Sequence, residues 1–354
     1  MKSVFENPLA WSRIRALLII LLILLTIALI IGGFLIYKKQ QRLIDIVQKN
    51  RRGLTEIIDS FVPIPVLKNI EIQEIRGHRV KLIPFHIIVS KDLDYIHNRH
   101  KKSSPGLLIK QYLVNGKTIS FHPKQWSHNL LNLCSHAEQR NGERDQPLLD
   151  YLLKQFESHI AEIDSAIFVG YPFRYEIFNR ILEPNWYSCI AQGHVLAALV
   201  KLYETTNNSK YLGMAKKTQK SFLQVRNEVG QKKPWISFVD DAQYLWFEEY
   251  PSTHDLQPRV LNGHIYALMG LYSYYRLNRN DETLTLLQAG MTTVQRYFNE
   301  YRRPGRINNY CLLPNSPPDY KPSRSIKQQE WLFHVTNAPV FKEQLSAFQT
   351  DMPF

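Results

Sequence analysis

The feature that most constrains the fold of this chain is a succession of apolar stripes with helical spacing, which begins near Pro123. Apolar residues that recur every three or four positions lie on one face of a helix. Alternating short and long connections join these segments, which favours stacked helical hairpins such as an incomplete α/α toroid. The stripes include Trp126-Leu130-Leu133-Ala137, Leu149-Leu152-Phe156-Ile160, Tyr187-Ile190-Ala191-Val195-Ala198-Leu202, Tyr211-Ala215-Phe222, Leu261-Ile265-Leu268-Tyr272 and Leu284-Leu287-Met291-Val294-Phe298.

A shorter period precedes the helical stripes. Alternating apolar and polar residues run from Ile70 to Ile75 and from Val80 to Ile83, and turn signals stand at 104–106 and at Asn115-Gly116. An Asn-Gly pair is a good hairpin signal. We therefore predict a mainly α chain with a smaller β-rich region over residues 66–122, followed by the helical domain over 123–354.

The N-terminal part contains an apolar run over residues 16–37. About 20 such residues cross a bilayer as a helix, and the run is followed by two lysines instead of a small-residue cleavage site. The pattern predicts a retained single-pass transmembrane anchor after a short flank at 1–15. Apolar residues at helical spacing then predict a juxtamembrane stalk over 38–65.

Charge and composition limit the kinds of molecule that this chain is expected to bind. The net charge of +13 favours a polyanion, which could be nucleic acid, an acidic membrane face or an acidic glycan. No nucleic-acid-binding signature stands out, so we expect no nucleic acid partner. Tyrosine is abundant, with 19 residues, and tyrosine-rich clefts often hold sugars although they also occur in helix packing. The three cysteines lack metal-ligand spacing, so no metal site is expected, and one disulfide stays open as an alternative.

The segment Trp246-Phe-Glu-Glu-Tyr-Pro251 places two carboxylates and a phenol among large aromatic residues. A carboxylate beside aromatic surface can have a raised pKa, which suits proton transfer near neutral pH. The alternative is a polar loop with ordinary surface glutamates. We expect Glu248 to be a solvated neighbour and Glu249 to be the candidate for chemistry.

Several segments together resemble one family. They are Trp186-Tyr-Ser-Cys-Ile-Ala-Gln-Gly193, Glu248-Glu-Tyr-Pro251, Val260-Leu-Asn-Gly263 with Leu268-Met-Gly-Leu-Tyr272, Ile326-Lys-Gln-Gln and Ala338-Pro-Val-Phe-Lys-Glu343. In this order, from about Leu107 to Phe348, they resemble the C-terminal domain of the D-glucuronyl C5-epimerases. The resemblance implies an isomerase that converts glucuronate to iduronate residues within a heparan-type polysaccharide. It also implies a β-rich part, an α/α barrel and often a membrane anchor.

The resemblance implies four catalytic positions. Glu249 and Tyr250 match the family's Glu-Tyr, Tyr310 matches a tyrosine of the following loop, and Tyr320 matches a proton-transfer tyrosine. The segment Tyr310-Cys-Leu-Leu313 lacks the arginine that would pair with the substrate carboxylate. His122 stands where the family has a tyrosine. These departures leave the identity of the substrate undecided. Without the family match, we would interpret Tyr310 and Tyr320 as packing residues of loops.

Inversion at carbon 5 of a uronate needs a base on one ring face, an acid on the other and cationic or hydrogen-bonding groups around the carboxylate. No metal or redox cofactor is chemically required. We expect Glu249 to accept the proton and Tyr320 to donate one, while Tyr250 and Tyr310 position the sugar or relay protons. The candidate substrate-binding residues are His122 (also a second acid/base, since its ordinary pKa is near neutral), Tyr187, Asn262 (or a helix cap) and, for the carboxylate, Arg174, Arg306, Lys321 and Arg324.

Two other functions remain open from the sequence. A uronate polysaccharide lyase would use the same proton abstraction, and a catalytically silent glycan-binding scaffold would use only the cleft. The partners expected are an acidic polysaccharide, a membrane and, by analogy with the family, a second copy in a homodimer. Polysaccharide chemistry favours a domain outside the cytoplasm, in a periplasm or Golgi-like lumen. The basic residues after the anchor favour the opposite orientation, which a large domain can override.

Overall fold

The computed structural model describes residues 69–100, 112–114, 117–139, 145–254 and 256–352. The predicted anchor at 16–37, the stalk at 38–65 and the turn at 104–106 lie outside these residues. Within the described part, no helix is both long and apolar enough to cross a membrane. The chain divides into a unit at 1–61 and a unit at 62–354, and only the second contains described residues.

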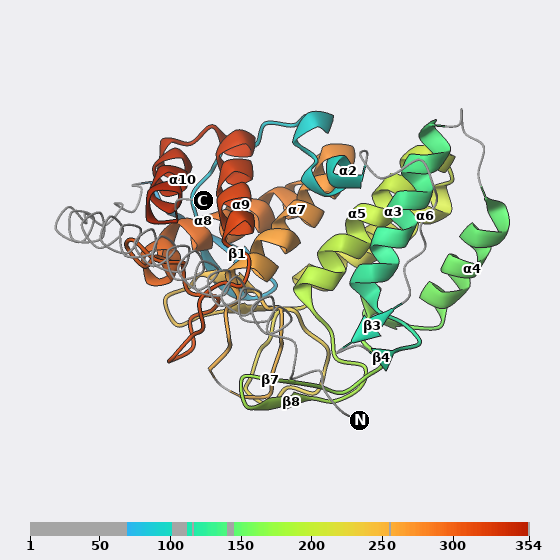
Figure 1. Ribbon diagram of the computed structural model, residues 1–354, viewed down its shortest axis with the longest axis horizontal. Coiled ribbons are helices and arrows are strands. Elements are labelled where there is room, and N and C mark those ends of the chain that lie inside the picture. Colours follow the sequence, from blue (N-terminus) through green and yellow to red (C-terminus); the bar gives the residue numbers. More distant parts are fainter. Residues whose placement is uncertain (1–68, 101–111, 115–116, 140–144, 255, 353–354) are drawn as a thin grey trace, which may run out of the picture. The chain divides into compact units, whose positions relative to one another are not determined.

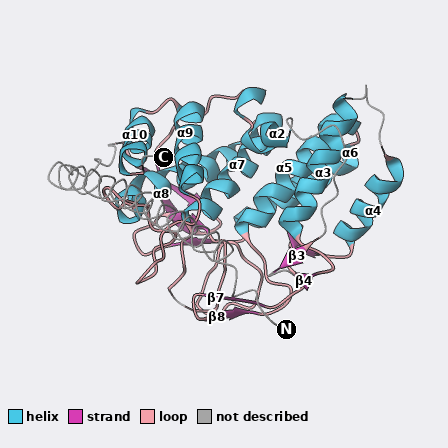
Figure 2. Ribbon diagram, viewed as in Figure 1, coloured by secondary structure: helices cyan, strands magenta, loops and turns pink. Residues whose placement is uncertain are grey.

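The described part is mainly helical with small sheets, which confirms the predicted fold class at this level (Figure 2). The α-helices are α2 (Tyr95–His100), α3 (Pro123–Gln139), α4 (Gln146–Glu157), α5 (Cys189–Thr206), α6 (Ser209–Lys220), α7 (Leu261–Leu277), α8 (Asp281–Tyr301), α9 (Pro322–Thr336) and α10 (Pro339–Asp351). Two 3-10 turns are η1 (Lys91–Leu93) and η2 (Ser221–Leu223).

The strands form five antiparallel two-stranded hairpins among the described residues. They are β1 (Glu71–Ile75) with β2 (His78–Leu82), β3 (Leu113–Val114) with β4 (Lys117–Thr118), β5 (Ile160–Ile163) with β6 (Ala166–Val169), β7 (Tyr175–Ile177) with β8 (Arg180–Leu182), and β9 (Ser237–Val239) with β10 (Leu245–Phe247). Strands β3 and β4 flank the predicted Asn-Gly turn. The last three hairpins lie within the segment predicted to be helical, and α2 lies within the segment predicted to be β-rich.

Consecutive helices pack as pairs: α3 with α4, α5 with α6, α7 with α8 and α9 with α10 (Figure 1). The first members of the pairs also pack on one another in the order α3, α5, α7 and α9. Helices α5 and α7 are buried on all sides over most of their length. A helix that is apolar all round belongs in the interior, so these two helices form the centre of the domain.

Helices α5 and α7 approach so closely that their backbones touch at two glycines. A Cβ atom added to Gly270 would lie 2.2 Å from the carbonyl oxygen of Gly193, and one added to Gly193 would lie 2.6 Å from the carbonyl oxygen of Tyr266. No side chain fits at such distances unless a helix moves. The crossing fixes the start of α7, and therefore the residues around it, against α5.

We expect Gly270→Ala to lower the free energy of unfolding by about 3 kcal/mol, because the added methyl group forces two central helices apart. Denaturant unfolding of the variant and its parent measures the difference. Gly213→Ala, inside α6, is the matched control, since its Cβ would meet nothing within 4 Å. That control should be neutral or slightly stabilising. Equal stabilities for the two variants would contradict the crossing.

Residues just before α2 hold this helix against the helical pairs. Trp331 Nε1 of α9 donates to the carbonyl oxygen of Leu93 at 3.0 Å. Buried Asp94 pairs with Arg276 of α7 at 3.1 Å, and Arg276 also pairs with Glu204 of α5 at 2.7 Å. These contacts hold α2 beside α5, α7 and α9.

Candidate functional site

Glu249 follows strand β10, in the connection that leads to α7. Backbone hydrogen bonds fix Glu248, the residue before it. The N–H of Glu248 donates to the carbonyl oxygen of Ile236 at 2.8 Å, and the carbonyl oxygen of Glu248 accepts from the N–H of Cys189 at 3.0 Å. The carboxyl group of Glu249 lies against the first turn of α7. A Cβ atom at Gly263 would lie 2.5 Å from Glu249 Oε2, so only glycine leaves room for the carboxyl group there.

Burial governs the chemistry of Glu249, whose residue is 7% exposed. Burial raises the pKa of Glu249, and the nearby ammonium group of Lys124 opposes that shift. Its Oε2 atom is buried and has no hydrogen-bond partner among the described residues. A buried carboxyl oxygen without a partner is costly in a fold and is typical of a group that meets a ligand or a proton.

Glu249 lines a cavity of about 280 Å³, the first cavity. One wall is a ladder of stacked rings: Tyr171 on Trp186 at 4.0 Å and 7°, Trp186 on Tyr175 at 5.8 Å, and Tyr175 on Tyr250 at 6.0 Å. An aromatic wall with phenol hydroxyl groups of this kind suits the ring of a sugar. The lining residues are Val114, His122, Lys124, Tyr171, Phe173, Tyr175, Trp186, Ser188, Ile190, Glu249, Tyr250 and Tyr320.

Tyr320 also lines the first cavity, although it comes from the turn before α9. Its side chain is 72% exposed, and Arg324 holds it in place. Arg324 Nη1 donates to the phenol oxygen at 2.8 Å, and its guanidinium group lies 4.3 Å from the ring centroid. Arg324 is fixed in turn by the buried carboxylate of Asp319 at 3.0 Å. The phenol oxygen therefore faces a cation.

The structure brings the other two predicted catalytic tyrosines together. The hydroxyl groups of Tyr250 and Tyr310 are 3.3 Å apart. Tyr310 and Tyr320 have ring centroids 5.7 Å apart. Tyr250 lines the first cavity. Tyr310 does not line it but contacts Tyr250. Burial raises the pKa of both Tyr250 and Tyr310, which favours the protonated phenols.

Of the predicted substrate-binding residues, His122 lines the first cavity, whereas Arg174, Tyr187, Asn262, Arg306, Lys321 and Arg324 do not. Arg174 is half-exposed and pairs with Glu176 at 2.9 Å and with Glu183 at 3.9 Å. Arg306 is exposed in the loop after α8. Tyr187 packs on Phe168 with ring centroids 5.1 Å apart. The sequence alone could not show that Glu176 and Glu183 pair with the side chain of Arg174.

His122 lines the first cavity, but its predicted acid/base role rested on an ordinary pKa. Burial, with the charge of Lys124, lowers the pKa of His122 to about 4. The imidazole is therefore neutral at pH 7 and fits a hydrogen-bonding role better than a proton-donating one. Asn262 is buried in the first turn of α7, where Val260 and not Asn262 is the N-cap residue.

Lys124 is the residue that the sequence interpretation missed. Among the described residues that line the first cavity, it is the one lysine or arginine. Burial lowers the pKa of Lys124 to about 8, and the charge of Glu249 opposes that shift. Lys124 is the second residue of α3, where the helix dipole disfavours a cation. A lysine at that position, directly after His122-Pro123, was the signal available in the sequence.

The prediction that Glu248 is solvated is wrong. Glu248 is fully buried, and its two carboxyl oxygens accept from the N–H groups of Tyr250 at 3.1 Å and Arg259 at 2.9 Å. Burial raises the pKa of Glu248 to about 7. Glu248 thus clamps the connection that carries Glu249, a tertiary role that the adjacent glutamates in the sequence do not reveal.

We expect Glu248→Gln to lower the free energy of unfolding by about 1–3 kcal/mol, because an amide accepts at only one of the two positions and leaves a buried N–H unpaired. Glu343→Gln on the exposed surface of α10 is the matched control and should change stability by less than about 0.5 kcal/mol. Denaturant titration of both variants measures the difference. A Glu248→Gln protein as stable as the control would rule out the clamp.

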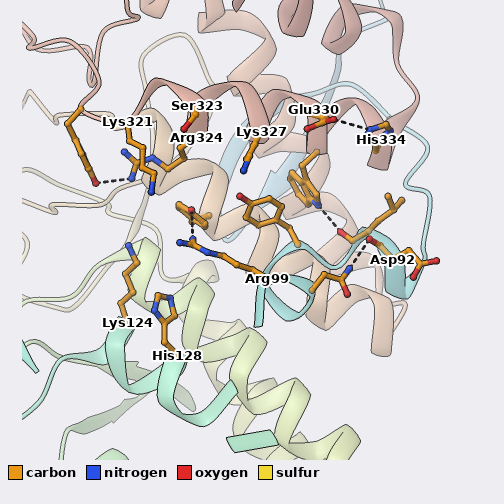
Figure 3. Close-up of a pocket in the computed structure, with 16 residues that line it drawn as sticks. Asp92, Arg99, Lys124, His128, Lys321, Ser323, Arg324, Lys327, Glu330 and His334 are labelled. Atoms are coloured by element: carbon orange, nitrogen blue, oxygen red, sulfur yellow. Dashed lines mark hydrogen bonds and ion pairs between the residues drawn. The ribbon is translucent and has the colours of Figure 1, made fainter. Parts of the chain in front are cut away.

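A larger second cavity, of about 760 Å³, adjoins the first and shares Lys124 and Tyr320 with it (Figure 3). It is lined by Asp92, Leu93, Tyr95, Asn98, Arg99, Lys124, His128, Tyr266, Tyr320, Lys321, Ser323, Arg324, Lys327, Glu330, Trp331 and His334. Two of the predicted carboxylate-binding cations, Lys321 and Arg324, line this cavity and not the first. Within the described ranges, no three His, Cys, Asp or Glu side chains are grouped as metal ligands would be.

Comparison with known proteins gives one family. The model of the D-glucuronyl C5-epimerase C-terminus matches residues 164–350. A D-glucuronyl C5-epimerase of Caenorhabditis elegans is 35% identical over 108 residues, which are 29% of this chain and 16% of that protein. An uncharacterized protein of Methanocaldococcus jannaschii is 26% identical over 198 residues, 55% of this chain and 62% of that one. The chain thus matches less than two thirds of the length of either relative.

Among solved structures, a cellobiose 2-epimerase of Spirochaeta thermophila has a TM-score of 0.48 at 10% identity, covering 85% of this chain and 84% of that one. A D-mannose isomerase has a TM-score of 0.46 at 15% identity, covering 73% and 66%. Likenesses this weak distinguish no function.

Proposed function

Because the chain belongs to the family of the D-glucuronyl C5-epimerase C-terminus, whose model matches residues 164–350, we propose that it inverts carbon 5 of uronic acid residues within an acidic polysaccharide. The observation that carries the proposal is the first cavity itself. Glu249, Tyr320 and Lys124 line the same space, and the Oε2 atom of Glu249 is buried without a partner among the described residues. These are a base, an acid and a cation, the three groups that the reaction needs.

The proposed reaction begins with transfer of the carbon 5 proton to the carboxylate of Glu249. The electron pair left on carbon 5 moves into the substrate carboxyl group, where the ammonium group of Lys124 stabilises the added charge. The hydroxyl group of Tyr320 then gives its proton to carbon 5 on the opposite ring face. The resulting phenolate is held by the guanidinium group of Arg324 until solvent returns a proton to it and takes the transferred proton from Glu249.

The reverse reaction uses the same groups in exchanged roles. The phenolate of Tyr320, beside Arg324, takes the proton from one epimer, and the acid form of Glu249 returns a proton on the other face. Burial raises the pKa of Glu249, which favours that acid form. The aromatic ladder and the Tyr250–Tyr310 pair would hold the sugar ring while the proton moves.

The wider organisation is part of the same proposal. The four helical pairs would form an incomplete α/α toroid, with residues 16–37 anchoring the chain in a membrane and the catalytic domain outside the cytoplasm. The net charge of +13 supports an acidic polymer as the substrate. Glucuronate-to-iduronate inversion is the reaction we propose, on the basis of the family match, and a homodimer is the proposed assembly.

The test is incubation of the protein with glucuronate-containing polymers in deuterated water. We expect deuterium at carbon 5, iduronate among the products and an unchanged chain length. Unsaturated ends that absorb ultraviolet light would show a lyase instead. Polymer binding with neither product would contradict the proposal and indicate a glycan-binding role.

The proposed role of Lys124 predicts a pH dependence. Burial lowers its pKa to about 8, so the ammonium group is charged below that pH and neutral above it. We expect kcat/KM for carbon 5 exchange to fall above about pH 8, since this parameter reports groups of the free enzyme. Lys124→Gln should lower kcat/KM by about a hundredfold at neutral pH.

Lys124→Arg separates charge from packing, because arginine stays protonated at every accessible pH. The variant should keep measurable activity and lose the decline above about pH 8. Exchange rates measured across the pH range decide the matter, with Lys342→Met on the exposed surface of α10 as the control. An unchanged decline in the arginine variant would mean that another group controls it.

A further inference from the structure

Lys124, the cation of the proposed reaction, is supported by an aromatic ring and not by an acid. Its ammonium group lies 5.6 Å from the ring centroid of Tyr266. A cation within about 6 Å of an aromatic face is attracted by the negative charge of that face. In the part of the chain that the structure describes, the ammonium group forms no ion pair and no hydrogen bond. The ring of Tyr266 is therefore the direct contact that holds this group in place.

Tyr266 is a rigid support. It is buried in α7, at the crossing with α5, where a Cβ atom at Gly193 would lie 2.6 Å from the Tyr266 carbonyl oxygen. Its ring packs on His194 with ring centroids 4.9 Å apart, and its hydroxyl group accepts from Arg99 at 3.2 Å. Neither the backbone nor the ring can move without displacing α5, so the aromatic face is in position before a substrate binds.

Charged groups from three elements face Lys124. Burial lowers its pKa, and Glu249, in the connection after β10, opposes that shift. The cations Arg324, Arg99 and Lys321 lower the pKa further. The other titratable groups beside it are His122, His128, Tyr266 and Tyr320. An ammonium group among like charges loses its proton more readily, so a contact that favours the charged form matters at this position.

An aromatic ring suits this task better than an acid would. A carboxylate beside Lys124 would neutralise its charge and accept its N–H groups, and a substrate carboxylate needs both. The face of a ring attracts the charge but leaves the three N–H donors of the ammonium group available. Tyr266 lines only the second cavity, so its ring takes no space from a sugar in the first cavity.

We propose that Tyr266 is a positioning residue, whose ring face keeps the side chain of Lys124 charged and holds it between the two cavities, ready for the substrate carboxylate. Lys124 lines both cavities, which places it at this boundary. Tyr266 acts through Lys124 and not on the sugar. The inference rests on the proposed function, since it takes Lys124 as the cation that meets the carboxylate.

Two rings of one shape at position 266 of the full-length protein test the inference. Tyr266→Phe and trifluorinated phenylalanine at the same position both lack the hydroxyl group, but fluorine withdraws the negative charge from the ring face. Lys124 is half-buried and lines both cavities, so a small amine-acylating reagent reaches it. Mass spectrometry of its acylation across the pH range reports the neutral amine without turnover. We expect the midpoint to lie about one pH unit lower with the fluorinated ring.

The decline of kcat/KM above about pH 8 should move to lower pH by the same amount. The same two rings at Tyr151, exposed on α4, are the control and should leave both midpoints unchanged. Equal amine midpoints for the two rings at position 266 would overturn the inference, as would an amine shift that leaves the kcat/KM profile in place. An amine shift in a protein whose parent shows no carbon 5 exchange would refute the proposed reaction and leave the contact of Tyr266 with Lys124 established.

Discussion

Glu249→Gln should lower carbon 5 hydrogen exchange by about a thousandfold, the size of effect that loss of a positioned general base produces. The amide has the shape of the carboxyl group, so it fits beside Gly263, where a Cβ atom would lie only 2.5 Å from Oε2. It cannot accept a proton from carbon 5. Deuterium incorporation into a glucuronate polymer, followed by nuclear magnetic resonance, measures the loss.

Binding separates loss of chemistry from loss of the site. The Glu249→Gln protein should bind the polymer within a few-fold of the parent, because Lys124 and the aromatic ladder remain. Glu343→Gln, on the exposed surface of α10, is the control for removal of a carboxylate and should exchange at the parent rate. Exchange by Glu249→Gln within tenfold of the parent would show that another group removes the proton.

Tyr320→Phe should lower inversion by about a hundredfold or more while sparing part of the exchange. Without the phenol, no acid stands on the second ring face, so the carbanion is protonated again from Glu249 on its original face. One epimer should therefore exchange its carbon 5 hydrogen with solvent without changing configuration. Both epimers, incubated separately in deuterated water, reveal this asymmetry.

Tyr151→Phe, at an exposed position of α4, controls for removal of a hydroxyl group and should leave inversion unchanged. Two outcomes would remove Tyr320 from the proposed mechanism. One is inversion by Tyr320→Phe at the parent rate. The other is equal loss of exchange for the two epimers, which would indicate that the phenol only supports the fold.

The helical part of the fold could be predicted from the sequence because its signal is local. The stripes of α3, α7 and α8 fall inside the observed helices, since burial of one face imposes a helical period on the residues. Three stripes run past their helices: Ile160 belongs to β5, Tyr187 precedes α5, and Phe222 belongs to η2. The short helix α2 was not predicted, because distant partners such as Trp331 and Arg276 fix it in place.

The candidate site could be predicted only in part. Glu249 and Tyr250 are adjacent in the chain, and the family resemblance added Tyr310 and Tyr320, so these four residues were found. Lys124 was missed because its approach to Glu249 requires the packing of α3 on α5 and of α5 on α7. That arrangement depends on the whole fold, including the contact of Gly193 with Gly270.

Electrostatic surroundings were the least predictable feature of the site. His122 titrates near neutrality as a free side chain, but burial lowers its pKa to about 4. Glu248 and Glu249 look alike in the sequence, yet backbone N–H groups hold one carboxylate whereas the other has an oxygen without a partner in the described chain. Such differences arise from burial and from partners far away in the chain.

The central claim is that a uronate ring lies between Glu249 and Tyr320, with its carboxylate at Lys124. A crystal structure of the inactive Glu249→Gln protein with an acidic oligosaccharide tests it most directly. The claim predicts carbon 5 within about 3–3.5 Å of both the residue-249 side chain and the Tyr320 hydroxyl group, on opposite faces of the ring. An oligosaccharide bound outside the first cavity, or with both side chains on one face of the ring, would contradict it.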